Sequence, residues 1–325
     1  MHMTIRTPIS RTIAWLEDLR LGRPAQVLFF GHGIGDDLLC TAVARELKKR
    51  GTGRIVMFSR HPALFEKNPD VAAVYGLDHA TIGRRRRWGY PSVVPYYASL
   101  EADGDREKFH NEHFIVTMCR MAGVRGTVDL RPYLTLEPEE KTGGQRLPNQ
   151  VAILSAGRAQ MKNKNWFPER YQAVVDALAD SFNFIQLGVP DDPPLRGVLD
   201  LRGRTNLRES AAILASSRVF IGQVGFLMHL ARAVECRSVI VYGGRETPLV
   251  DGYAGNENLT GPMPCSPCWQ RNRCDFDREC MRMIEPEAVI AAFHRQLARE
   301  DEPLPVGQAT VTDCYAEISK PLASK

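Results

Sequence analysis

The sequence lacks the features that mark a membrane-spanning or secreted protein. Its 325 residues contain no run of about 18 consecutive apolar residues, the length of an ordinary transmembrane helix. Residues 1–11 have no apolar core region of the kind that a secretory signal needs. We therefore expect a cytoplasmic protein.

The sequence also lacks a strong charge of either sign and any short repeat or low-complexity tract. A net charge of +4 does not indicate a nucleic-acid-binding protein, so we expect no nucleic-acid partner. The length, with an apolar fraction of 44%, is sufficient for two globular domains of ordinary size.

What is present is a repeated alternation of apolar strand and amphipathic helix, which predicts an α/β protein with parallel sheets. The pattern runs once before residue 138 and starts again at residue 151, after a polar segment rich in helix breakers. We predict two successive α/β halves, an N-terminal domain of residues 1–145 and a C-terminal domain of residues 146–300. Residues 301–325 have little periodicity and are expected to be a loose or surface-packed tail.

The opening unit has a glycine-rich loop between a predicted strand at residues 27–30 and a predicted helix at residues 38–50. The loop ends in Asp36 and Asp37, which therefore follow the carboxyl end of a strand. Ligands of open α/β sheets bind at that edge. Asp is also a favoured helix cap, so the loop alone leaves capping and catalysis both open.

A basic tract follows the third predicted strand. It consists of Arg84, Arg85, Arg86 and Arg87, with aromatic residues directly after it. Such a run is most often a solvated surface, but the neighbouring aromatic residues also suit an anionic or sugar-bearing partner.

Two loops of the second half follow strands and lead into helices. The loop at residues 156–168 contains Lys162 and Lys164, and cations near a helix start suit an anion such as a diphosphate. The second loop, at residues 222–226, can offer free backbone amides to the same anion. Its glycines are equally explained by a plain tight turn.

Four of the eight cysteines fall within sixteen residues: Cys265, Cys268, Cys274 and Cys280. In a reducing compartment this clustering favours thiols or metal ligands over disulfides. Four thiolates suit a structural zinc or iron ion, although cysteine is also common in protein cores. Four protein ligands leave no open coordination position, so we expect no catalysis at such a metal.

Three segments in order resemble the family nine glycosyltransferases of bacteria, which include the ADP-heptose:lipopolysaccharide heptosyltransferases. They are residues 33–39, residues 164–171, and residues 225–231 with the Val-Tyr-Gly-Gly of residues 241–244 after them. The resemblance implies a glycosyltransferase B fold, in which two Rossmann-like domains face each other across a cleft. It also implies inverting sugar transfer without a catalytic metal, with the acceptor on the N-terminal domain and the nucleotide sugar on the C-terminal one.

The resemblance implies a role for individual residues. Asp36 matches the family's general base, and Lys164 matches the lysine that stabilises the donor phosphates. A carboxylate can take the proton of an attacking hydroxyl, and an ammonium stabilises a departing diphosphate. The expected donor-binding residues are Lys164, Gln223, Gly225, Phe226, Met228, Gly243 and Glu246, and the expected acceptor-binding residues are Gly35, Arg84, Arg85, Arg86 and Arg87.

One position departs from the family pattern. Family members usually have an Asp where this sequence has Gln223, and that Asp is implicated in binding the donor sugar. A neutral amide can bind hydroxyls but cannot act as an anion, so either the donor sugar is not heptose or it is held in another way. The expected donor sugar is therefore heptose or a related sugar. The departure also leaves open the alternative that the protein is catalytically silent and binds glycan or nucleotide. The expected acceptor is a glycan or glycolipid, and the protein is expected to contact the inner membrane peripherally. His229 is expected to be a packed histidine.

Overall fold

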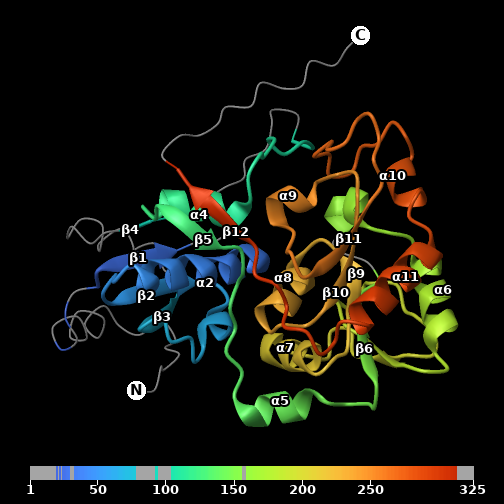
Figure 1. The fold of residues 1–325 in the computed structure, drawn as a ribbon, viewed down its shortest axis with the longest axis horizontal. Coiled ribbons are helices and arrows are strands. Elements are labelled where there is room, and N and C mark those ends of the chain that lie inside the picture. The colour runs from blue at the N-terminus through green and yellow to red at the C-terminus, as the bar shows by residue number, and fades with distance from the viewer. Residues whose placement is uncertain are drawn as a thin grey trace.

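The computed structural model describes residues 20, 22, 24–29, 33–77, 92–93, 104–155 and 159–312. Two α/β halves lie side by side (Figure 1). The sheet of the first half has the strand order β3-β2-β1-β4, and that of the second has the order β11-β10-β9-β6-β7-β8. All strand pairs within these two sheets are parallel, which confirms the fold class predicted from the sequence.

The first half contains short buried strands. Its elements are β1 (Gln26–Phe29), α2 (Ile34–Lys49), β2 (Ile55–Ser59), the 3-10 helix η1 (Pro62–Phe65), β3 (Ala73–Gly76), β4 (Ser92–Val93), α4 (Phe114–Met121) and β5 (Gly126–Asp129). Val27 and Leu28 of β1 are fully buried, as expected for a strand that is paired on both sides within a parallel sheet. The basic tract Arg84–Arg87 lies outside the described residues.

Helix α2 begins earlier than the sequence suggested. The loop predicted up to Asp37 ends at Gly33, which is the N-cap, so Asp36 and Asp37 both lie in the first helical turn. The reason is a local hydrogen bond, in which Asp36 Oδ2 accepts from the Gly33 amide at 3.0 Å. This bond satisfies an amide that the helix leaves free and extends the helix toward the sheet.

The second half contains the larger sheet. Its elements are α5 (Pro138–Gly144), β6 (Gln150–Ile153), η2 (Ala159–Lys164), α6 (Pro168–Leu178), β7 (Asn183–Gln186), β8 (Leu199–Asp200), α7 (Leu207–Ala215), β9 (Phe220–Gln223), α8 (Phe226–Ala233), β10 (Ser238–Gly243), α9 (Pro248–Asp251), β11 (Asn256–Thr260), α10 (Glu279–Arg282), α11 (Pro286–Leu297) and β12 (Gln308–Val311). Among the helices of the described segments, none has both the length and the apolar character that a membrane crossing requires.

Two segments differ from their predicted character. The expected linker forms helix α5, because Pro138 occupies its first turn and Glu140 completes a capping box with Glu137. In the expected tail, β12 returns to the first half and pairs antiparallel with β5 (Figure 1). The chain therefore crosses between the halves twice.

Two adjacent glycines of α5 provide a matched test of how closely it packs on α7. A Cβ added at Gly144 would lie 2.0 Å from the carbonyl oxygen of Ala212, whereas one added at Gly143 would meet nothing within 4 Å. We expect Gly144→Ala to lower the free energy of unfolding by about 1–3 kcal/mol through overpacking. Gly143→Ala should leave it unchanged or raise it, since alanine favours the helix. Urea unfolding of the two variants checks this, and equal stabilities would contradict it.

Candidate active site

The first turn of α2, which holds Asp36, lies where the N-terminal half meets the C-terminal half. A Cβ added at Gly35 would lie 3.3 Å from His229 Cδ2 and 3.8 Å from the Cα of Phe226. Both neighbours lie on the first turns of α8, so two helix starts pack directly on each other. Only glycine allows this approach without displacing the imidazole ring. Two predicted site residues, Gly35 and Phe226, thus come from opposite halves and lie together.

On the C-terminal side, the predicted donor residues Lys164 and Glu246 form an ion pair. Lys164 Nζ lies 2.7 Å from Glu246 Oε1, and the second oxygen of Glu246 accepts from Arg245 Nη1 at 3.1 Å. The Glu246 side chain is almost fully buried, so its charge requires these partners. Arg245 in turn pairs with Glu107 of the first half at 2.9 Å.

The other predicted donor residues lie along the same edge of the second sheet. Gln223 ends β9 and donates from Nε2 to Asn165 Oδ1 at 2.8 Å. Gly225 is the N-cap of α8 and has a φ of 153°, which favours glycine. Met228 is fully buried in the core, and a Cβ at Gly243 would meet Met281 at 2.6 Å. Met228 and Gly243 therefore contact the protein interior.

His229 is packed, as expected, but it also connects the two sides of the site. Its Nδ1 lies 2.6 Å from the hydroxyl of Tyr253, and its ring contacts Gly35. Burial is the main reason that its pKa is lowered to about 3, and the nearby ammonium of Lys164 lowers it further. His229 is therefore neutral at physiological pH and lies within electrostatic reach of Lys164.

The two buried histidines predict an acid-sensitive fold. Burial lowers the pKa of His113 to about 4 and that of His229 to about 3, whereas both titrate near 6.5 when unfolded. Below that value the unfolded chain binds more protons, so each histidine should destabilise the fold by about 1.4 kcal/mol per pH unit. We expect this loss as pH falls from about 6.5 toward 4. Urea unfolding between pH 7 and pH 5 should show a shallower pH slope for His113→Gln than for the wild type.

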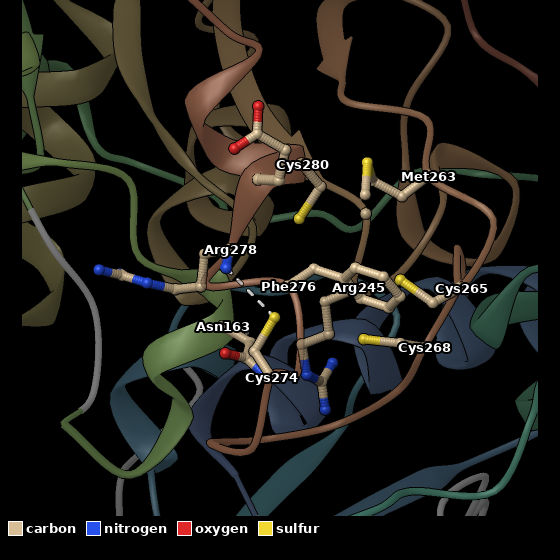
Figure 2. Close-up of a pocket in the computed structure, with 11 residues that line it drawn as sticks. Asn163, Arg245, Met263, Cys265, Cys268, Cys274, Phe276, Arg278 and Cys280 are labelled. Carbon is tan, nitrogen blue, oxygen red and sulfur yellow. Dashed lines mark hydrogen bonds between the residues drawn. The ribbon is translucent and has the colours of Figure 1, made fainter.

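The four clustered cysteines converge on one small cavity. Cys265, Cys268, Cys274 and Cys280 line a space of about 20 Å³, into which Figure 2 shows their side chains directed. Burial is the main reason that the pKa values of Cys265, Cys268 and Cys280 are raised, and the neighbouring cluster thiols raise them further. All four thiols are therefore close enough to influence one another.

The convergence does not amount to a metal site in this structure. Within the described residues, no three His, Cys, Asp or Glu side chains lie close enough together to hold a metal ion. The chemistry of the four donors suits zinc or iron, but their spacing here does not. The sequence-based expectation of a metal-binding cluster is therefore not supported by the geometry.

The cysteine-containing loop instead connects the donor side to the first half. Asn163, which precedes Lys164, donates from Nδ2 to the carbonyl oxygens of Gln270 at 3.2 Å and Arg273 at 2.7 Å. Arg271 of the same loop pairs with Glu107 at 3.1 Å. Burial alone would raise the pKa of Glu107, but the positive charges of Arg245, Lys164 and Arg271 together outweigh burial and lower it. This loop therefore fixes the backbone next to Lys164.

The sequence did not reveal several of these residues. Arg245 and Asn163 directly precede predicted residues in the chain, so the motifs could have pointed to them. Glu107 and Tyr253 carry no local signal, because their partners are distant in sequence and depend on how the two halves pack.

Two α/β halves with parallel sheets, lying side by side, have the architecture of the glycosyltransferase B fold. The family model of glycosyltransferase family 9 (heptosyltransferase) matches residues 129–276, which lie mostly in the C-terminal half. The resemblance to family nine glycosyltransferases seen in the sequence is thus confirmed. No curated protein matches the sequence significantly.

Solved structures share the fold. A family 9 glycosyl transferase from Veillonella parvula has a TM-score of 0.64 at 14% identity, over 85% of this chain and 98% of its own. ADP-heptose lipopolysaccharide heptosyltransferase II of E. coli has a TM-score of 0.62 at 14% identity, over 85% and 99%. The iron-containing dodecameric glycosyltransferase TibC from enterotoxigenic E. coli has a TM-score of 0.65 at 19% identity, over 85% and 77%.

Proposed function

We propose that this protein is an inverting glycosyltransferase that moves heptose or a related sugar from a nucleotide-diphosphate donor to a glycan or glycolipid of the bacterial envelope. The observation that carries the proposal is the position of His229. Its ring contacts the turn that holds Asp36 and lies within electrostatic reach of Lys164. A proposed base and a proposed phosphate-binding cation thus both lie in the neighbourhood of one imidazole ring.

The reaction would proceed in one displacement. The acceptor hydroxyl attacks the anomeric carbon, its proton passes to the Asp36 carboxylate, and the bond from that carbon to the diphosphate oxygen breaks. The leaving diphosphate gains negative charge, which the Lys164 ammonium and the amides at the start of α8 stabilise. No step requires a metal ion, and the basic residues Arg84–Arg87 would bind the acceptor.

Lys164 is paired with Glu246, and this ion pair affects how a donor diphosphate would bind. The diphosphate must share Lys164 with Glu246 or displace it. Glu246 remains neutralised by Arg245, so the exchange leaves no buried charge without a partner. The direct test of the proposal is turnover with a panel of ADP-, GDP- and UDP-sugars, together with envelope glycans as acceptors.

The second candidate is a catalytically silent protein that binds nucleotide or glycan. It is favoured by Gln223, a neutral amide bonded to Asn165 at the position where family members usually have an acid. Isothermal titration calorimetry discriminates the two. Binding of nucleotide sugars without donor consumption would favour the silent protein, whereas release of free nucleoside diphosphate would favour the enzyme. In either case we propose a cytoplasmic location, with peripheral contact at the inner membrane.

We also propose that the cysteine cluster takes up a structural zinc or iron ion when its loop rearranges. The support is the shared cavity and the similarity of fold to an iron-containing glycosyltransferase. We expect about one metal ion per chain by elemental analysis of protein produced with both metals, and loss of it in Cys268→Ser. Cys236→Ser, a buried cysteine outside the cluster, is the control. Metal-free wild-type protein would contradict the proposal.

A further inference from the structure

Asp37, Ser59 and His61 form a hydrogen-bonded cluster beside Asp36 that the proposed reaction does not use. Asp37 Oδ2 accepts from Ser59 Oγ at 2.5 Å and from His61 Nδ1 at 2.9 Å. The His61 amide donates to Ser59 Oγ at 2.8 Å. Helix α2 and the end of β2 thus hold one imidazole in a fixed orientation.

The cluster determines which ring nitrogen of His61 carries the proton. An ionised carboxylate only accepts hydrogen bonds, so Nδ1 is the protonated nitrogen of the neutral ring. Nε2 then presents a lone pair. Within the described residues Nε2 has no hydrogen-bond partner, and the side chain is 29% exposed. His61 therefore offers a hydrogen-bond acceptor to solvent or to a ligand.

Asp37 contributes a second observation. Its side chain is only 1% exposed, and within the described part of the chain its Oδ1 atom has no hydrogen-bond partner. An unsatisfied buried oxygen lowers the stability of the fold by about 1–3 kcal/mol. A carboxylate whose only role was to connect two segments would therefore be destabilising. Directing both bonds to Oδ2 has one clear effect, which is to orient His61.

The position of His61 suits an acceptor. It follows β2 at the carboxyl edge of the first sheet, where ligands of α/β proteins bind. The next residues form η1, which packs on α7 of the second half. Ala63 and Glu66, just after His61, line a cavity of about 580 Å³ between η1, α5 and α7. A saccharide at this edge would have both halves as walls.

We propose that His61 binds the acceptor by accepting a hydrogen bond at Nε2 from a sugar hydroxyl next to the reacting one. Asp37 and Ser59 are positioning residues that act through His61. This inference rests on the proposed function, because it assigns a further contact to the acceptor side of the same reaction.

Diethyl pyrocarbonate, which acylates unprotonated imidazole, tests the proposal on the full chain with peptide mapping. We expect His61 to react faster than the buried His113 and His229. Deacylated lipopolysaccharide core oligosaccharide should slow the reaction of His61 about tenfold, the effect of one hydrogen bond, and leave the exposed His294 unchanged. Unchanged reactivity of His61 with this glycan, or an unreactive His61, would overturn the proposal.

The separate effects of a His61 substitution on KM and kcat distinguish a role in acceptor binding from a structural role. With an active donor, His61→Gln should raise the KM for the acceptor about tenfold, with kcat and donor affinity within about threefold of wild type. His294→Gln is the matched control. Parallel changes in kcat and donor affinity would show a structural role and overturn the proposal. If calorimetry shows no nucleotide binding, the proposed function is wrong. The protection of His61 by the glycan is measured without nucleotide, so it tests the role of His61 independently of that result.

Discussion

Asp36→Asn is expected to lower the kcat for sugar transfer by about 10²–10⁴-fold, the usual contribution of a general base. Asparagine has nearly the shape of aspartate, and its side-chain oxygen can still accept the hydrogen bond from the Gly33 amide that caps α2. The substitution therefore removes the charge and the proton-accepting group while it keeps the helix start. Steady-state kinetics with the donor sugar found in the panel provide the measurement.

The control for this prediction is Asp180→Asn, the same change at an exposed aspartate just after α6. It should leave kcat unchanged. Donor affinity of Asp36→Asn, measured by calorimetry, should stay near the wild-type value, because the proposed mechanism places Asp36 on the acceptor side. Full activity of Asp36→Asn with the correct donor would refute the assignment of the base.

Lys164→Ala is expected to lower kcat/KM for the donor by about 10²-fold or more, because one fixed cation is lost where the phosphate charge develops. Lys162→Ala is a matched control, since Lys162 lies in the same 3-10 helix and its side chain is exposed. Affinity for the bare nucleoside diphosphate should fall in Lys164→Ala alone. If Lys164 only balances Glu246, the variant would lose stability in urea yet keep its nucleotide affinity.

The order of strands and helices could be predicted from sequence because it follows from local apolar periodicity. The same holds for residues that belong to contiguous motifs, such as Lys164. The start of α2 was missed because it depends on one side-chain bond, from the Gly33 amide to Asp36, which periodicity does not register. Strand β12 was missed because residues 308–311 gain their pairing only from a distant partner, β5.

Long-range contacts explain the remaining differences at the site. The sequence left a capping role open for either aspartate of the loop; the capping carboxylate is Asp36, and Asp37, also in the first turn, faces Ser59 and His61 more than twenty residues away. The pairing of Glu107 with Arg245 depends on how the two halves meet. The cysteine spacing suggested a metal-binding cluster; the four side chains line one cavity, but spacing alone cannot fix the distances that a metal ion requires.

The return of the chain through β12 bears on how the enzyme could open. Its two crossings between the halves run side by side, since the Leu130 amide donates to the Gly307 carbonyl at 2.8 Å. Two connecting segments that are hydrogen-bonded to each other act as a hinge. They would restrict movement of one half relative to the other to rotation about this point. Asp129, next to Leu130, pairs with Lys49 in the last turn of α2, so the first turn of α2, which packs on α8, lies at the other end of that helix and would move further. Donor entry and product release would depend on separating that contact.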